Sequence, residues 1–179
     1  TGNEADNDIT ITGGGTDTID GQDGFDTVII NNIRSNFTIT NNAGSGLTVG
    51  SGTSSFTDIT ITNSTSGTGL YNAGTGELIN VSVSGSSSDG IRSGPHTSLQ
   101  NCSASSNGAY GIWIDNAGFF NNCLADGNAK GIYVGTYSSE FINCLSTNNT
   151  TYGIELLNSS SLIQNCTLSG NGTGILNPA

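Results

Sequence analysis

The residues of this sequence that are best able to do chemistry are its carboxylates. Asp and Glu number 14 against three Lys and Arg, which gives a formal charge of −11 at pH 7. Between residues 2 and 28 the acids alternate with glycines, and Asp17 and Asp26 are nine residues apart. This excess of acid favours a divalent cation as a partner, or simply solubility. It repels polyanions at long range, so we expect no nucleic-acid binding.

Four cysteines recur at spacings of 21, 21 and 22 residues, and each follows an asparagine. They are Cys102, Cys123, Cys144 and Cys166. A tetrahedral metal site needs ligands that converge on one point, whereas equally spaced residues in stacked coils lie on a line. Stacked thiols are within range of a disulfide, but with a poor dihedral angle. We therefore expect free, buried thiols that pack as small hydrophobes.

Other residues recur in step with the cysteines and predict a repeat of about 21 residues. Glycine–isoleucine pairs begin at Gly90, Gly111, Gly131, Gly153 and Gly174, and a column of asparagines comprises Asn107, Asn128, Asn149 and Asn171. Within a coil, Ile112 and Ile114 alternate with Trp113, a period of two that is typical of strands. The low hydrophobic content of 33% favours disorder, but the fixed spacing predicts an all-β parallel β-solenoid of six to seven coils instead.

Stacking of the coils predicts which side chains meet in the core. One inward stack is expected to contain Leu78, Leu99, Phe120, Phe141 and Ile163, and a second the four cysteines with Val81 and Ile59. The asparagines that precede the cysteines, together with Asn80, are expected to form an internal ladder of hydrogen-bonded amides. Asn80, Asn101 and Asn165 begin Asn-x-Ser/Thr sequons, which we interpret as accidents of this buried ladder.

The N-terminal segment has a different pattern. It contains Gly13-Gly14-Gly15-Thr16-Asp17-Thr18-Ile19 and then Gly21-Gln22-Asp23-Gly24-Phe25-Asp26-Thr27-Val28. The pair resembles the calcium-binding nonapeptide of RTX proteins, although Thr12 and Gln22 stand where the family has glycines. The resemblance implies secretion and a calcium site made by Asp8, Asp17, Asp23, Asp26, Gly15 and Gly24. The alternative is a first solenoid coil with acidic turns.

The repeats carry a second resemblance. Segments such as Ser105-Ser106-Asn107-Gly108-Ala109-Tyr110-Gly111-Ile112 and Leu162-Ile163-Gln164-Asn165-Cys166 look like coils of the right-handed parallel β-helix superfamily. That superfamily includes pectate lyases and mannuronan C5-epimerases, and the epimerases combine a β-helix with RTX modules. The resemblance implies that the solenoid is a right-handed parallel β-helix.

The same resemblance implies a catalytic cluster. Residues 89–96 correspond to the epimerase motif Tyr-Gly-Phe-Asp-Pro-His, retaining Pro95-His96 without the Tyr and the Asp. The implied cluster comprises His96, Asp115, Arg92 and Tyr133. In it, His96 or Tyr133 would supply acid and base, and Arg92 would neutralise a uronate carboxylate. Because the motif is incomplete and cations are few, we expect no catalytic site, and we interpret Trp113 and Tyr133 as surface or sugar-stacking residues.

We therefore expect a non-catalytic extracellular structural protein, either secreted or at the cell surface. Residues 1–43 would form an RTX-like acidic segment with bridging strands, and residues 44–179 the β-helix repeats. The repeats lack a capping helix, so their edges are expected to pair end to end with further copies into a filament or surface assembly stabilised by calcium. The alternatives are a fragment of a secreted polysaccharide-modifying enzyme and a carbohydrate-binding module with an extracellular polysaccharide as partner. No apolar run approaches the ~20 residues that span a membrane.

Overall fold

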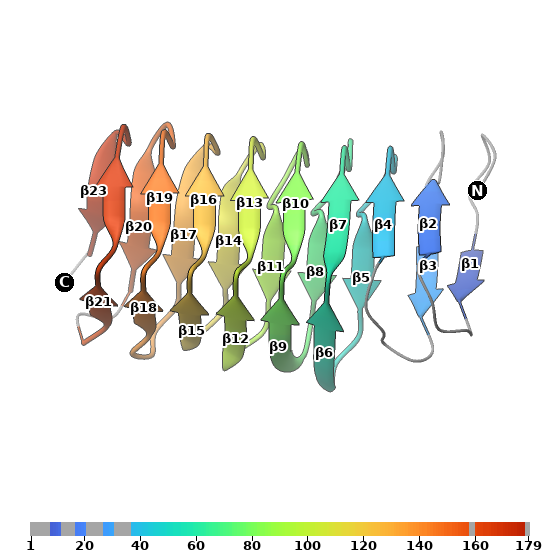
Figure 1. Cartoon of the computed structure of the whole chain (residues 1–179), viewed down its shortest axis with the longest axis horizontal. Coiled ribbons are helices and arrows are strands. Elements are labelled where there is room, and N and C mark those ends of the chain that lie inside the picture. Colours follow the sequence, from blue (N-terminus) through green and yellow to red (C-terminus); the bar gives the residue numbers. More distant parts are fainter. Residues whose placement is uncertain (1–7, 12–16, 21–26, 31–36, 158–159, 178–179) are drawn as a thin grey trace.

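The polypeptide is wound into a right-handed parallel β-solenoid of about seven coils, with about 21 residues per turn (Figure 1). The computed structural model describes residues 8–11, 17–20, 27–30, 37–157 and 160–177, with side chains from Thr38 onward. Within these ranges the elements are strands and turns, and none is a helix long and apolar enough to cross a membrane. The predicted fold class and coil length are confirmed.

Three long parallel sheets form the sides of the solenoid in the described part of the chain. The eight-stranded sheet comprises β2 (Asp17–Asp20), β4 (Phe37–Thr40), β7 (Ile59–Thr62), β10 (Ser82–Ser84), β13 (Ser103–Ser105), β16 (Leu124–Asp126), β19 (Leu145–Thr147) and β22 (Thr167–Ser169). The seven-stranded sheet comprises β5 (Leu47–Val49), β8 (Leu70–Asn72), β11 (Ile91–Ser93), β14 (Tyr110–Ile114), β17 (Lys130–Val134), β20 (Tyr152–Leu156) and β23 (Thr173–Leu176). The six-stranded sheet comprises β6 (Thr53–Thr57), β9 (Thr75–Ile79), β12 (Thr97–Gln100), β15 (Gly118–Asn121), β18 (Glu140–Ile142) and β21 (Leu162–Gln164).

The predicted inward stack of the six-stranded sheet is confirmed. Leu78, Leu99, Phe120 and Phe141 are fully buried, and Ile163 packs half-buried against the core. They pair in register from strand to strand. The rings of Phe120 and Phe141 stack with centroids 4.5 Å apart and an angle of 6° between their planes. Burial of a side chain of this size contributes about 1.5–3 kcal/mol.

The cysteines form a second inward stack and are all free. Cys102, Cys123 and Cys144 are buried, whereas Cys166 is half-buried. The Sγ atoms point at main-chain carbonyls of the preceding coil, as from Cys123 to the oxygen of Leu99 at 3.5 Å. The interaction with the Cys102 thiol, together with burial, raises the pKa of Cys123 to about 12. Cys123 is therefore a poor nucleophile and a poor metal ligand, whereas the same interaction lowers the pKa of Cys102.

The asparagines that precede the cysteines are exposed, so the prediction that they form an internal ladder was wrong. Each occupies a one-residue bend with φ of 52 to 54°; they are Asn80, Asn101, Asn122, Asn143 and Asn165. Asparagine suits this position because it tolerates the left-handed conformation. The bend turns the neighbouring side chains inward and leaves the amide on the surface, where Asn101 Nδ2 donates to Asn80 Oδ1 at 3.2 Å. The sequons at Asn80, Asn101 and Asn165 therefore begin at exposed residues.

The internal ladder is formed by the other asparagine column. Asn107, Asn128 and Asn149 are at most 3% exposed, and Asn171 is half-buried. The backbone N–H of Asn107 donates to Asn128 Oδ1 at 2.9 Å, and that of Asn128 donates to Asn149 Oδ1 at 3.0 Å. The side-chain Nδ2 atoms make the same step, from Asn107 to Asn128 at 2.9 Å and from Asn128 to Asn149 at 3.1 Å. Each coil is thus tied to the next through buried amides.

The glycine column makes room for this ladder. A Cβ atom at Gly90 would lie 2.5 Å from Asn107 Nδ2, and one at Gly111 would lie 2.6 Å from Asn128 Nδ2. Both distances are far inside van der Waals contact. The recurring glycine before isoleucine is therefore required by close approach of the backbone to the ladder.

At the N-terminal end, β2 and β4 belong to the eight-stranded sheet, whereas β1 (Asp8–Ile11) pairs with β3 (Thr27–Ile30). The eight-stranded sheet therefore runs across the boundary between residues 43 and 44, and the division into two segments stays a prediction. Of the predicted calcium ligands, Asp8 and Asp17 are placed only by the backbones of β1 and β2. The others, Gly15, Asp23, Gly24 and Asp26, lie outside the described residues, so the calcium site also stays a prediction.

We predict that Asn128→Ala destabilises the solenoid by about 3 kcal/mol. The side chain makes four hydrogen bonds, and its loss leaves buried donors of Asn107 without partners. Urea unfolding followed by circular dichroism measures the change. Asn122→Gly is the matched control, because glycine keeps the positive φ and removes an exposed amide, and it is expected to cost less than about 1 kcal/mol. Equal losses in the two variants would contradict the assignment of the internal ladder.

Candidate functional site

A column of large side chains lies along the outer surface of the seven-stranded sheet. We call it the outer stripe, and it consists of Tyr71, Arg92, Trp113, Tyr133 and Glu155. These residues occupy one register position in β8, β11, β14, β17 and β20, each directly after an inward residue such as Ile112. Parallel pairing places successive members about 4.8 Å apart. Strand alternation therefore turns five consecutive coils into one continuous surface row.

The centre of the outer stripe is a stack of rings and one guanidinium. Arg92 lies 4.6 Å from the ring centroid of Trp113 and 5.9 Å from that of Tyr71. The Trp113 and Tyr133 rings are 4.4 Å apart and tilted by 42°. Asp115 accepts a hydrogen bond from Trp113 Nε1 at 2.9 Å and lies 3.9 Å from Arg92 Nη2. Cation–π contacts and this carboxylate thus hold the ring positions.

A second column runs beside the outer stripe and supports it. The Oη of Tyr110 donates to Glu155 Oε2 at 2.6 Å, and Lys130 Nζ donates to the same Oη at 2.9 Å. Tyr110 is 8% exposed, and its ring meets the rings of Trp113 and Tyr133 edge-on with centroids 4.8 and 5.5 Å apart. Tyr110 therefore packs against both partly exposed rings and holds them in place.

Burial controls the ionisation of these groups. Desolvation, and then the hydrogen bond to Glu155, raises the pKa of Tyr110 well above its ordinary value. Desolvation and the charges of Glu155 and Asp115 likewise raise the pKa of Tyr133. Both phenols are therefore protonated at neutral pH and available as hydrogen-bond donors rather than as bases.

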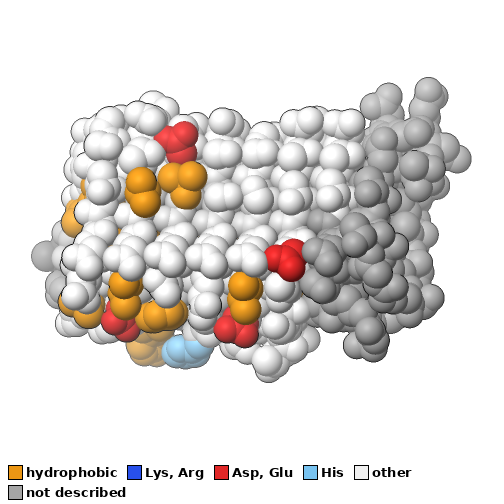
Figure 2. Space-filling model, in the orientation of Figure 1, with side chains coloured by type: hydrophobic (Ala, Val, Ile, Leu, Met, Phe, Trp, Pro, Cys, Tyr) orange, Lys and Arg blue, Asp and Glu red, His pale blue; other side chains and the backbone are white. Residues whose placement is uncertain are grey.

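Both cations of this surface have partners within the site. The described residues include one arginine, Arg92, and one lysine, Lys130. Arg92 lies near Asp115, and Lys130 contacts the hydroxyl and the ring of Tyr110. The opposite face of the solenoid, in front in Figure 2, shows a histidine at its lower edge but no Lys or Arg among the residues drawn in colour. The seven-stranded sheet thus presents aromatic rings and hydroxyls, with both cations lying over rings of the site.

The structure brings together three of the four residues of the implied catalytic cluster. Arg92 and Tyr133 belong to the outer stripe and Asp115 lies beside it, and Trp113 contacts all three. His96 instead occupies the bend before β12 with φ of 56°, and its ring faces Tyr137 with centroids 6.3 Å apart. Sequence reasoning missed the supporting residues Tyr110, Lys130 and Glu155. The repeat could have identified them, because Glu155 shares the register position of Tyr133 and Lys130 shares that of Tyr110.

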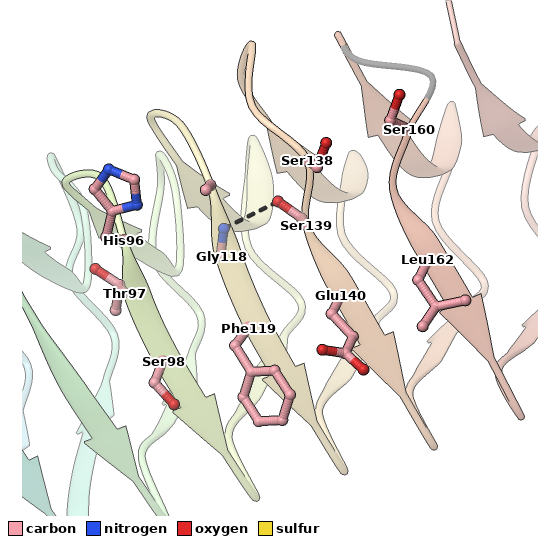
Figure 3. A pocket seen from close by; sticks show the side chains of 11 residues that line it. His96, Thr97, Ser98, Gly118, Phe119, Ser138, Ser139, Glu140, Ser160 and Leu162 are labelled. Carbon is pink, nitrogen blue, oxygen red and sulfur yellow. Dashed lines mark hydrogen bonds between the residues drawn. The ribbon is translucent and has the colours of Figure 1, made fainter.

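His96 lines a groove of about 510 Å³ over the six-stranded sheet. Figure 3 shows the side chains of Ser98, Phe119, Glu140 and Leu162 in a row across four strands, with His96, Ser138 and Ser160 on the bends above. The row is set by register, because Ser98 pairs with Phe119, Phe119 with Glu140 and Glu140 with Leu162. Ser139 Oγ accepts a hydrogen bond from the backbone N–H of Gly118 at 2.9 Å and closes the upper wall.

Comparison with protein-family models identifies one match, to a family described as the right-handed β-helix region, over residues 6–146. Comparison with curated proteins and with solved structures finds no match. The family match covers most of the chain and agrees with the observed winding of the coils.

We predict that Asp89→Asn stabilises the protein at pH 7. Asp89 is 4% exposed, and its Oδ1 accepts a hydrogen bond from the Tyr110 N–H at 3.1 Å. Desolvation raises its pKa above the ordinary 3.8, although this hydrogen bond and the charges of Arg92 and Lys130 act in the opposite direction. A carboxyl whose pKa is raised on folding favours the folded state at low pH and loses that contribution as pH rises through the folded pKa. Asparagine keeps the acceptor without the charge.

Denaturant unfolding at pH 7 and at about pH 3 measures this effect. The gain of Asp89→Asn should be present at pH 7 and shrink toward zero below the ordinary carboxyl pKa, where both side chains are neutral. The control is Asp115→Asn, since this carboxylate is 46% exposed and paired with Arg92, so we expect no gain there. A loss of stability in Asp89→Asn at pH 7 would show that its ionised form is favoured by the two cations.

Proposed function

Because this chain belongs to the right-handed β-helix family, we propose that it is a non-catalytic extracellular β-helix that binds a neutral glycan along the outer stripe. The observation that carries the proposal is the pair of rings of Trp113 and Tyr133, 4.4 Å apart and partly exposed, on the outer surface of the seven-stranded sheet. Tyr71, with 37% of its surface exposed, extends this platform beyond Arg92.

Contact with aromatic side chains suits a glycan because sugar rings have an apolar face and a rim of hydroxyls. Rings repeated along the solenoid axis offer the apolar contact in more than one coil. Large rigid rings provide contact area at low cost in conformational entropy. Tyr133, with its protonated phenol, and Asp115 at the edge provide a donor and an acceptor for the hydroxyls.

The charge balance favours a neutral chain over a uronate. Arg92 is the side chain suited to clamping a carboxylate, but it lies 3.9 Å from Asp115 Oδ1 and beside the Trp113 ring. Lys130 is hydrogen-bonded to Tyr110, which in turn binds Glu155. With a formal charge of −11 on the whole chain, a polyuronate meets long-range repulsion.

The same contacts support binding rather than catalysis. Proton abstraction beside a uronate needs a base, an acid and a group that neutralises the carboxylate. His96 lies in the bend before β12 and lines the groove of the six-stranded sheet. Tyr133 has a raised pKa, and Arg92 is engaged by Asp115. An enzyme acting on uronates is the alternative that the experiment below also tests.

We predict that Trp113→Ala weakens the binding of soluble neutral oligosaccharides, such as cello- or xylo-oligosaccharides, about 30-fold. A central aromatic anchor is typically worth about 2 kcal/mol or more. Isothermal titration calorimetry measures the affinity, with Leu145→Ala as control because this exposed apolar residue lies in the eight-stranded sheet. Alginate and pectate, titrated in parallel, are expected to bind more weakly than the neutral chains.

Two results would overturn this proposal. Equal affinity of wild type and Trp113→Ala would remove the outer stripe from binding. Unsaturated-uronate absorbance, or a changed sugar stereochemistry by NMR, after incubation with alginate or pectate would favour the enzyme if the activity is lost in His96→Ala.

A building-block role is a second candidate, favoured by the edge at β21, β22 and β23. Within the described residues, each of these strands has a parallel neighbour on one side only. Leu162 and Ile175 on these strands are 52% and 44% exposed. Such an edge pairs readily with another coil, whether from more of the same chain or from a second copy. Repeated pairing between copies would be a head-to-tail contact and would produce a filament.

We predict that concentrated protein forms particles longer than one solenoid, visible by electron microscopy, in the presence of calcium. A chelator is expected to shorten them if the acidic N-terminal segment binds calcium at the joint. Ile175→Lys should give monomers, because a charged edge opposes strand pairing. Leu145→Lys is the matched control on the side of the solenoid, where the wild-type leucine is 46% exposed. Monomers of the wild-type protein at high concentration with calcium would rule out the filament.

A further inference from the structure

We propose that the groove of the six-stranded sheet is a separate recognition site for a sugar that carries a primary ammonium group. The groove has a volume of about 510 Å³, within the size range of sites that bind small molecules. Its lining includes none of the outer-stripe residues, so it is independent of the glycan platform on the seven-stranded sheet.

The floor of the groove places an aromatic ring beside a carboxylate. Phe119 in β15 and Glu140 in β18 are direct partners across the parallel pair, so their side chains leave the same face about 4.8 Å apart. Leu162 continues the row on the far side of Glu140, and Figure 3 shows these three side chains adjacent on neighbouring strands. An aromatic face next to an acid is the arrangement that attracts an ammonium ion, through the ring quadrupole and through Coulomb attraction.

The carboxylate of Glu140 is available to such a ligand. The ion pair found within the described part of the chain joins Arg92 and Asp115, so Glu140 is in no ion pair there, and His96 is the one basic side chain among the residues that line the groove. No Lys or Arg lines the groove, and Glu140 is the one acid among its lining residues. The formal charge of −11 on the chain adds to the attraction for a cation and opposes an anion.

The remaining lining favours a sugar over a flexible amine. Ser98 and Ser138 place hydroxyls along the groove, where they are able to bond with ring hydroxyls. Thr97 and Ser139 are buried and hydrogen-bonded within the wall, Thr97 Oγ1 donating to the carbonyl of Gly94 at 3.0 Å. A pocket with a rigid wall, a flat ring and hydroxyls around one carboxylate matches a polyol ring with a single charged substituent.

The test uses three oligosaccharides of equal length and linkage that differ in one substituent of the sugar ring. These are a glucosamine oligomer with free amines, its N-acetylated counterpart and a cello-oligosaccharide. They are titrated calorimetrically into the Trp113→Ala variant, which weakens binding at the outer stripe, at a pH at which the amines are protonated. We expect the glucosamine oligomer to bind at least about tenfold more tightly than the other two, as a charge-assisted hydrogen bond provides.

Glu140→Gln in the same background should abolish this preference, and Phe119→Ala should weaken it. The matched control is Glu77→Gln, because Glu77 pairs with Ser98 in the outward column of the same sheet but does not line the groove. An unchanged melting temperature in Glu140→Gln shows that the variant is folded. Equal affinity for the three oligomers, or a preference that survives Glu140→Gln, would overturn the proposal. Comparable affinity for a lysine tripeptide would contradict the sugar assignment.

The outcome is separable from that of the proposed function. If the outer stripe binds no neutral glycan but binding of the glucosamine oligomer still depends on Glu140, the proposed function fails and the groove proposal holds. If Trp113→Ala removes all binding, including that of the glucosamine oligomer, the groove proposal fails and the outer stripe accounts for every ligand.

Discussion

Each residue of this solenoid has as its nearest neighbours the residues at the same position in the coils before and after it, one strand spacing away. The side chains of each column must therefore pack on, or hydrogen-bond to, the equivalent side chains of the neighbouring coils. Apolar columns satisfy the constraint by packing, as Phe120 does on Phe141. A buried polar column satisfies it only if each member is both donor and acceptor, and the amide of asparagine meets that condition from Asn107 to Asn149. Glycine at positions such as Gly111 follows from the ladder, because a side chain would collide with the amide.

The same constraint explains what could be predicted from the sequence. Columns in register identified the coil, the inward stacks and the free thiols, because repeated spacing translates directly into contacts. Spacing alone did not tell which asparagine column faces inward. Asn101 and Asn107 recur with equal regularity, but Asn101 occupies a left-handed bend that turns its amide outward, whereas Asn107 does not. The difference is a backbone conformation, which a column of identical letters does not reveal.

The candidate sites were predictable to different degrees for a related reason. Trp113 and Tyr133 alternate with inward isoleucines, so their outward positions and mutual contact follow from strand periodicity. The separation of His96 from that surface depends on the bend between β11 and β12, which directs it to a different side of the solenoid. The groove lies where the bends at residues 94–96, 115–117 and 135–139 differ in sequence and shape from coil to coil. The surfaces formed by strands can thus be predicted from the sequence repeat, whereas the surfaces formed by bends cannot.

The one-rung-per-coil register of the outer stripe also has an evolutionary consequence. Duplication or deletion of a whole coil gives every ladder amide an equivalent partner and lengthens or shortens the row that contains Tyr71, Arg92 and Trp113 by one member. Insertions of other lengths must be accommodated in the bends, where they alter local surfaces without disturbing the row. The length of the long face of the solenoid therefore changes by whole coils, through duplication or deletion of existing sequence rather than through new residues.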